Sequence, residues 1–301
     1  MKLLGGFKRR LRRMTSTILR QLEYSYDSRT AKSSELQCLL KSNYRILKGM
    51  GNRAAMPSLK DVGFQTYSQF EEDGILLYLF SIVGTSNKRI VEMCVGNGRE
   101  CMATNLIINH GWEGLLFDGD ADQVKSARDF FREHPSTFAC PPAVVHAWLD
   151  VDNVNALISE YGFSGEVDLL SLDIDGNDYW LLKSITAINP KIIICETQDI
   201  IPSHLSFTIP YDPNFSYHKL PKEEQDFRGM SLLAANKLCS QKGYRLIGSH
   251  RYGFNVIFMR NDTGLEYFPE VSLESVHANP WTRFGQRERW PRVKDLKWVE
   301  V

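Results

Sequence analysis

The stretch Arg89–Gly98, RIVEMCVGNG, decides how the rest of the chain is interpreted. Its first part is mostly apolar, as a buried strand is, and Gly96-Asn97-Gly98 ends it. Residues Glu100–Asn109, which follow, are compatible with a helix. The order strand, tight glycine turn, helix predicts a turn at the carboxyl end of the first strand of an open α/β sheet, which is where such sheets bind ligands.

Glu92, just before this turn, bears on which ligand would bind. A carboxylate here suits a cationic or amino-bearing ligand and repels a pyrophosphate. The dinucleotide pattern G-x-G-x-x-G also fails, because Cys101 stands where its third glycine belongs. The pattern E-x-x-x-G-x-G after a strand is instead similar to the S-adenosylmethionine turn of class I methyltransferases. We therefore expect Glu92, Gly96 and Gly98 to bind S-adenosylmethionine, and a dehydrogenase is the least favoured class.

The charge of the chain is unevenly distributed, although its formal net charge is zero. Residues 1–60 hold 14 Lys/Arg and 3 Asp/Glu, a net charge of +11, and residues 61–301 hold 22 and 33, a net charge of −11. An acidic domain argues against a nucleic-acid substrate on its surface. The 301 residues suffice for one large α/β domain with extensions.

Cysteine usage and hydropathy bear on location. The six cysteines show no C-x-x-C spacing, which favours reduced thiols in a cytoplasmic protein. No run of 18 apolar residues is present to span a membrane, and the basic N-terminus lacks the apolar core of a signal peptide. The expected location is therefore the cytoplasm, with the inner face of the membrane as an open alternative.

We expect three parts: a basic helical extension over 1–60, a catalytic domain over 61–265 and a tryptophan-containing tail over 266–301. Within 1–22, apolar residues recur at helical spacing and basic residues mostly face the other way. One interpretation is a helix lying on an anionic membrane surface. The alternatives are an arm that packs on the domain or on a second subunit, and a disordered segment.

Strand-like and helix-like segments alternate through the catalytic domain. After the first strand, we expect strands over 115–117, 143–149, 167–172 and 192–195, helices over 121–134, 151–161, 181–188 and 231–242, and a closing hairpin of 244–248 and 255–260. Short links between alternating elements predict a doubly wound, mostly parallel α/β sheet, and the hairpin adds one antiparallel strand. This is the Rossmann-like architecture of class I methyltransferases, here with a helical N-terminal extension.

Acidic residues follow the second and third strands. Asp118 ends the second strand, where a carboxylate can hold the two hydroxyls of a ribose. The alternative of a helix cap suits Asp120 better than Asp118. Asp150 follows the third strand, and it either accepts a bond from an adenine amino group or caps the next helix.

The fourth strand runs into Asp173-Ile174-Asp175-Gly176-Asn177-Asp178, and Glu196 ends the fifth. In methyl transfer to a hydroxyl, Asp173, Asp175 or His204 would be the general base. Alternatively, Asp173 and Glu196 would bind magnesium (Mg2+), which lowers the pKa of the hydroxyl. The structural interpretation is a sheet-end cap for Glu196 and plain surface positions for His204 and His218. Both histidines lie in a long irregular segment, residues 199–229, which we call the lid.

Several motifs together resemble those of the FkbM-type methyltransferases. They are SQFEED at 68–73, VEMCVGNG at 91–98, Thr104-Asn105 with GWEGLLFDGD at 111–120, LLSLDIDGND at 169–178 and IIICET at 192–197. Two positions depart from that family, which usually has glycine where Cys94 and Glu71 stand. Cys94 is small enough to be accommodated if its backbone conformation is ordinary.

The resemblance implies methyl transfer to a hydroxyl, often on a sugar or another small molecule, and it does not reach residues 1–60 or 266–301. Two other functions remain open: a nucleic-acid methyltransferase with a basic N-terminal arm, and a non-catalytic partner protein that retains the fold. The acidic domain counts against the first, and Glu92, Asp118 and Asp173 count against the second. The expected acceptor is a small molecule or glycan, and an oligomer remains open.

Overall fold

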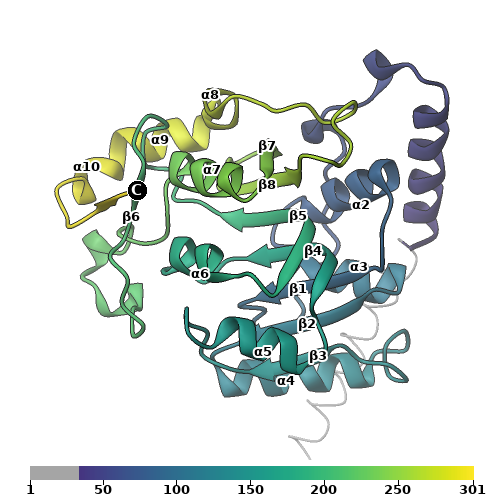
Figure 1. The fold of residues 1–301 in the computed structure, drawn as a ribbon, viewed down its shortest axis with the longest axis horizontal. Coiled ribbons are helices and arrows are strands. Elements are labelled where there is room, and N and C mark those ends of the chain that lie inside the picture. The colour runs from purple at the N-terminus through teal and green to yellow at the C-terminus, as the bar shows by residue number, and fades with distance from the viewer. Residues whose placement is uncertain (1–33) are drawn as a thin grey trace, which may run out of the picture.

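The computed structural model describes residues 34–301, and its centre is a seven-stranded sheet (Figure 1). The strands are β1 (Arg89–Met93), β2 (Glu113–Asp118), β3 (Ala143–His146), β4 (Gly165–Leu172), β5 (Ile188–Glu196), β7 (Tyr244–Ser249) and β8 (Asn255–Arg260). They lie in the order β3-β2-β1-β4-β5-β8-β7, and β8 is antiparallel to both of its neighbours. This confirms the predicted Rossmann-like methyltransferase fold with its closing antiparallel hairpin. The predicted amphipathic stretch 1–22 lies outside the described residues.

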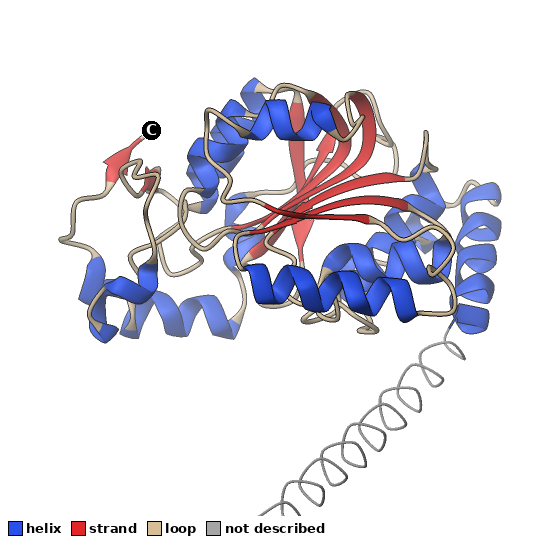
Figure 2. Cartoon of the chain, turned by 90° about the horizontal axis from the view of Figure 1, so that it is seen from below, coloured by secondary structure: helices blue, strands red, loops and turns tan. Residues whose placement is uncertain are grey.

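Helices cover both faces of the sheet (Figure 2). Packed against one face are α2 (Glu72–Val83), α3 (Met102–His110) and α4 (Ala121–Glu133), and against the other α5 (Val154–Glu160), α6 (Asp178–Ser184) and α7 (Leu232–Gln241). Neighbouring strand residues alternate between the two cores: Leu169 packs in the first, and Leu170 packs in the second. The central strands are mostly apolar because neither face of the sheet meets water.

Several element boundaries differ from the prediction, by up to four residues. The third strand ends at His146, so residues 147–150 form a loop. The fifth strand begins at Ile188 and runs through Pro190, which we expected to end a helix. At Pro190 the strand pairs with Val167 of β4, and its pairing with β8 starts only at Ile192. Proline is tolerated there because no second ladder requires its missing N–H.

Residues 34–49 form a helix that packs on the catalytic domain. The Gln37 and Asn105 amides exchange two 3.0 Å hydrogen bonds. The ring of Tyr44 meets the ring of Tyr78 edge-on, with their centroids 4.8 Å apart. This part of the extension is therefore joined to the first core.

The C-terminal tail packs on the lid. It contains α8 (Leu273–His277), α9 (Pro280–Glu288), α10 (Trp290–Val293) and β9 (Val299–Glu300). Strand β9 pairs with β6 (Phe207–Thr208), a short strand of the lid. Ile200 and Ile201 of the lid form a third apolar cluster with Val293 of the tail. The tail therefore fixes the position of the lid.

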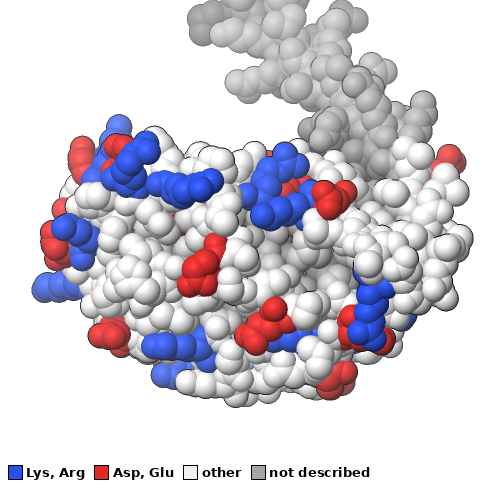
Figure 3. Space-filling model, turned by 90° about the horizontal axis from the view of Figure 1, so that it is seen from above, with Lys and Arg blue, Asp and Glu red and all other residues white. Residues whose placement is uncertain are grey.

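Lys/Arg and Asp/Glu side chains are interspersed on the face of the described residues that Figure 3 shows, with uncharged surface between them. A nucleic-acid backbone needs a continuous basic surface, and this face does not offer one. Among residues 34–301, no helix has both the length and the apolar character needed to cross a bilayer.

Replacing Tyr44 tests whether the 34–49 helix contributes to stability. Tyr44 is 8% exposed, so Tyr44→Ala leaves a cavity beside Tyr78 and should lower the free energy of unfolding by about 3 kcal/mol. Arg45→Ala, at an exposed position of the same helix, should change it by less than about 0.5 kcal/mol. Urea unfolding of both variants measures the difference. Equal stabilities would show that the helix is not part of the folded core.

Candidate active site

Glu92 joins the first strand to the helix after the turn. Its two carboxylate oxygens accept from the backbone N–H groups of Met102 (2.9 Å) and Ala103 (2.6 Å), in the first turn of α3. The side chain is only 4% exposed, and burial raises the pKa of its carboxyl to about 7 although both N–H groups favour the ionised form. In this structure Glu92 holds helix α3 in place, and its direct contact with a ligand stays a prediction.

The turn itself has an unusual backbone. Gly96 and Gly98 have positive φ angles of 54° and 73°, and a Cβ on Gly98 would lie 2.9 Å from the Phe131 ring. Cys94 also has a positive φ, 69°. The condition under which Cys94 would be easily accommodated, an ordinary backbone conformation, is therefore not met. A residue with a Cβ is strained in this region, by about 1–2 kcal/mol, so a glycine would fit this position better.

Asp118 braces the turn from the second strand. One carboxylate oxygen accepts from the Gly96 N–H at 2.7 Å, and the other accepts from the Asp120 N–H at 2.8 Å. Asp120 caps α4 by accepting from Asp122 and Gln123, which confirms that the cap is Asp120. A carboxylate has about four acceptor sites, so Asp118 retains capacity for further donors.

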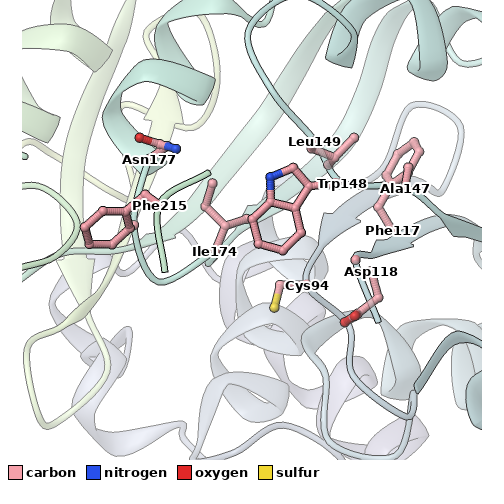
Figure 4. Close-up of a pocket in the computed structure, with 11 residues that line it drawn as sticks. Cys94, Phe117, Asp118, Ala147, Trp148, Leu149, Ile174, Asn177 and Phe215 are labelled. Carbon is pink, nitrogen blue, oxygen red and sulfur yellow. The ribbon is translucent and has the colours of Figure 1, made fainter. Parts of the chain in front are cut away.

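A cavity opens beside the turn, and we call it the turn cavity (Figure 4). It is lined by Cys94, Phe117, Asp118, Gly119, Ala147, Trp148, Leu149, Ile174, Gly176, Asn177 and Phe215. The indole of Trp148 lies in the middle, with Cys94 and Asp118 on one side and Ile174 and Phe215 on the other (Figure 4). The cavity is thus bounded by the ends of β1, β2 and β4 and by the lid.

A hydrogen bond to the lid and close packing on Gly119 fix the position of Trp148. Its Nε1 donates to the Pro213 carbonyl at 2.7 Å. A Cβ on Gly119 would come within 2.7 Å of the indole, so a larger residue there would displace it. Asn177 Nδ2 also donates to the Asp212 carbonyl, at 2.7 Å. The lid is therefore closed over the turn cavity.

Asp150 accepts backbone hydrogen bonds just before α5. One of its oxygens accepts from the N–H groups of Asp152 and Asn153, both at 2.9 Å. Asp150 is not one of the residues that line the turn cavity. These bonds hold the turn that leads into α5 (Val154–Glu160), whose own N-cap residue is Asn153, and the bond of Asp150 to an adenine stays a prediction.

Three acids meet at the ends of β4 and β5. Carboxylate oxygens of Asp173, Asp175 and Glu196 all lie within 4.8 Å of one another, and we call these residues the acid cluster. Burial, and then the neighbouring Asp175, raise the pKa of Asp173 to about 7. Burial and Asp173 raise the pKa of Glu196 well above its usual value. Two adjacent half-buried carboxyls cannot both ionise easily, so they favour sharing one proton.

Arg228 of the lid is the charge partner of the acid cluster. Its Nη1 lies 2.6 Å from Asp175 Oδ1, and its guanidinium lies over the Tyr217 ring. Asp178 holds the backbone of the loop that follows β4, because it accepts hydrogen bonds from the N–H groups of Ile174 and Gly176. The loop therefore carries one acid that holds its backbone and others that remain available for chemistry.

A second cavity, of about 380 Å³, has Glu196 in its wall. It is lined by Gln69, Phe70, Glu196, Gln198, Asp199, Arg228, Tyr252, Phe254, Trp281 and Arg289, and we call it the aromatic cavity. The Phe70 ring centroid is 4.9 Å from that of Tyr252 and 5.5 Å from that of Phe254. Glu196, a member of the acid cluster, and Arg228, its charge partner, both line the aromatic cavity.

The structure separates the histidines of the lid from this site. His204 and His218 are exposed, and neither lines the turn cavity or the aromatic cavity. Asp173 and Glu196 come together as the sequence predicts, and Asp175 joins them. A catalytic role for any of these residues, His204 included, stays a prediction.

Sequence reasoning missed Trp148, Arg228 and Trp281. Trp148 was assigned to the third strand, whereas it lies in the loop beyond it. Arg228 ends the lid, and Trp281 comes from the tail. A tryptophan shortly after a strand end was the only available signal, because the chain beyond the motifs has no pattern that places its side chains.

No protein-family model and no curated protein sequence matches the chain. Solved structures similar to it include the N-terminal domain of EvdMO1 with SAH bound, at 14% identity and a TM-score of 0.41, covering 64% of this chain and 82% of that one. Another is magnesium protoporphyrin IX methyltransferase (ChlM) from Synechocystis PCC 6803 with bound SAM, at 13% identity and a TM-score of 0.39, covering 63% and 77%. At these identities no residue of this chain takes a role from either protein.

The buried Glu92 carboxyl should leave a signature in the pH dependence of stability. Its raised pKa means that the folded chain retains a proton that the unfolded chain has lost, so stability is lost as pH rises from about 4.5 to about 7, by about 3 kcal/mol in all. Glu92→Gln should lack this part of the slope, whereas Glu100→Gln, at an exposed position, should retain it. Urea unfolding at several pH values gives the slopes. A wild-type slope in Glu92→Gln would contradict the assignment.

Proposed function

We propose that this protein is an S-adenosylmethionine-dependent methyltransferase that methylates a hydroxyl of a sugar, a glycan or another small molecule. The observation that supports this most is the position of the acid cluster, which adjoins two different cavities. Ile174 and Gly176, from the same loop, line the turn cavity, and Glu196 lines the aromatic cavity. A methyl donor and a hydroxyl acceptor need two such sites that meet at one point.

The turn cavity would hold the methyl donor. The glycines allow close approach of the backbone, and Asp118 offers carboxylate oxygens to the ribose hydroxyls. The face of Trp148 offers an aromatic surface on which the adenine ring stacks. The nearby carboxylates of the acid cluster suit the positive charge of a sulfonium.

The aromatic cavity would hold the acceptor. Its rings present flat apolar surface, and its acids, amides and arginines present hydrogen-bonding groups, a combination that binds a polar ring compound. Methyl transfer is an in-line displacement, so placing the hydroxyl oxygen opposite the sulfonium supplies much of the rate. Glu196 is the member of the acid cluster that lines this cavity, and it would accept the hydroxyl proton while Asp173 adjusts its pKa.

A magnesium ion at Asp173, Asp175 and Glu196 is the other way to activate the hydroxyl. The three carboxylates supply the oxygen ligands that this ion prefers. Arg228, however, already contributes a positive charge at 2.6 Å from Asp175. A second cation beside the guanidinium would be repelled, so we favour the general-base route. Where magnesium binds, these three residues would hold it, and it would lower the pKa of the hydroxyl.

Calorimetric titration with S-adenosylmethionine tests the first part of the proposal. Asp118→Ala removes the acceptor for the ribose and should weaken binding by about 1.5–3 kcal/mol. Asp120→Ala is the matched control, because Asp120 caps α4 and does not line the turn cavity, and it should bind as wild type does. If wild-type protein does not bind the compound, or Asp118→Ala binds it equally well, the cofactor assignment is wrong.

The acid cluster is tested by transfer of a labelled methyl group to a panel of sugars and other small hydroxyl compounds. Glu196→Gln and Asp173→Asn should each reduce transfer about 100-fold or more while cofactor affinity is retained. Wild-type activity should rise with pH above the usual titration range of a glutamate, because burial and Asp173 raise the pKa of Glu196 and the base acts only after losing its proton. Undiminished activity in EDTA supports the base, and activity lost to EDTA and restored by magnesium supports the metal. Full activity in both variants would show that the acid cluster is structural.

A further inference from the structure

An apolar stripe runs along the outer face of the 34–49 helix, which stands at the edge of the molecule (Figure 1). Leu36, Leu39, Ile46 and Met50 are exposed by 63%, 61%, 61% and 71%. They account for four of the ten large apolar residues that are exposed among residues 34–301. This much apolar surface on one short helix is typical of an interaction surface.

The spacing of the stripe indicates what covers it. Including Asn43, its positions are 36, 39, 43, 46 and 50, so the steps alternate between three and four residues. This is the a/d pattern by which two helices pack side by side, and a single polar asparagine in such a seam fixes how the pair aligns. Asn43 is exposed and lies at the middle of the stripe.

We propose that this stripe, Leu36, Leu39, Asn43, Ile46 and Met50, is a homodimer interface that pairs with the same stripe of a second copy. If the two helices run parallel about a two-fold axis along the seam, each position faces its own copy, so Asn43 of one copy lies against Asn43 of the other. The two amides then satisfy each other, as asparagines in helix seams do. The leucines, isoleucine and methionine on either side lose their exposure to water.

A lipid surface fits the stripe less well. Asn43 would enter the apolar layer without a partner, which is costly. The basic residues of the helix also do not lie on the same side as the stripe. Lys48 donates to the Ile82 carbonyl at 2.7 Å, toward the domain. Lys41 and Arg45 lie about 160° and 200° around the helix from Asn43, at 100° for each residue.

Residues 1–22 of the same chain are also disfavoured by charge. They carry seven basic residues and no acidic ones. The 34–50 segment carries three basic residues and one acidic residue, so the two segments repel each other. A second copy of 34–50 brings a smaller positive charge to the interface, and this repulsion weakens as salt is added.

The dimer should be weak and concentration-dependent. The helix is already folded on its domain through Gln37, Tyr44 and Lys48, so pairing does not have to nucleate it. Four exposed side chains per copy, however, provide less area than a standard interface of about 800 Å² per partner. A dissociation constant in the micromolar range is expected for an interface of this size. The stripe is remote from both cavities, so this inference does not depend on the proposed function.

Sedimentation equilibrium of the full chain, from about 1 to 200 μM, tests the interface across the expected range of affinity. Wild type should pass from monomer to dimer over this range, and the Leu39→Glu/Ile46→Glu double variant should remain monomeric at every concentration. Leu265→Glu is the matched control, because Leu265 is 60% exposed and lies outside the stripe, and it should dimerise as wild type does. Circular dichroism and urea unfolding should show the double variant to be folded. A monomeric wild type, or an unchanged dimer in the double variant, would overturn the proposal.

Cross-linking provides a test that does not require dissociation. In a Cys38→Ser background, which removes the other cysteine of this helix, Asn43→Cys should give a disulfide-linked dimer on mild oxidation. The same protein with Asn43 retained should give none. Absence of the Asn43→Cys cross-link would contradict the symmetric arrangement. Binding of wild type to anionic vesicles that the Leu39→Glu/Ile46→Glu variant loses would assign the stripe to lipid instead.

Discussion

The contact on which the site depends is that between the Glu92 carboxylate and the first turn of α3. The N–H groups in the first turn of a helix have no acceptor within the helix, and in α3 two of them donate to Glu92. The acid lies on β1, so this contact fixes the distance between strand and helix. The intervening turn then has little freedom, and Gly96 directs its N–H to Asp118 of the next strand. One buried carboxylate thereby aligns the ends of β1 and β2.

The acids around the site fall into two kinds. Glu92 and Asp178 each accept two backbone N–H groups, so their charge is compensated by the fold itself. Asp173 and Glu196 have each other and the nearby guanidinium of Arg228 instead. Side-chain compensation can change when a ligand binds, whereas compensation by backbone N–H groups is part of the fold and stays in place. This difference separates acids that hold the site from acids that can take part in a reaction.

The part of the site that could be predicted from sequence is the part that strand ends determine. Gly96, Asp118, Asp173 and Glu196 were placed together because parallel strands end at one edge of a sheet, and the structure places them there. The strand through Pro190 was not predicted because the sequence does not show that only β4 pairs with the chain at this position. The left-handed backbone at Cys94 was not predicted because a cysteine, unlike a glycine, does not signal such a turn.

The walls of the aromatic cavity come from the segments that no motif covers. Trp281 and Arg289 belong to the tail, and Arg289 pairs with Asp226 of the lid. Trp298 of the tail packs on Phe227, with ring centroids 4.6 Å apart. Arg228 is the next residue, so the tail sets the position of the cation that faces the acid cluster. The motifs therefore indicate a methyl donor but not an acceptor, because the residues that would select the acceptor are positioned by contacts between the tail and the lid.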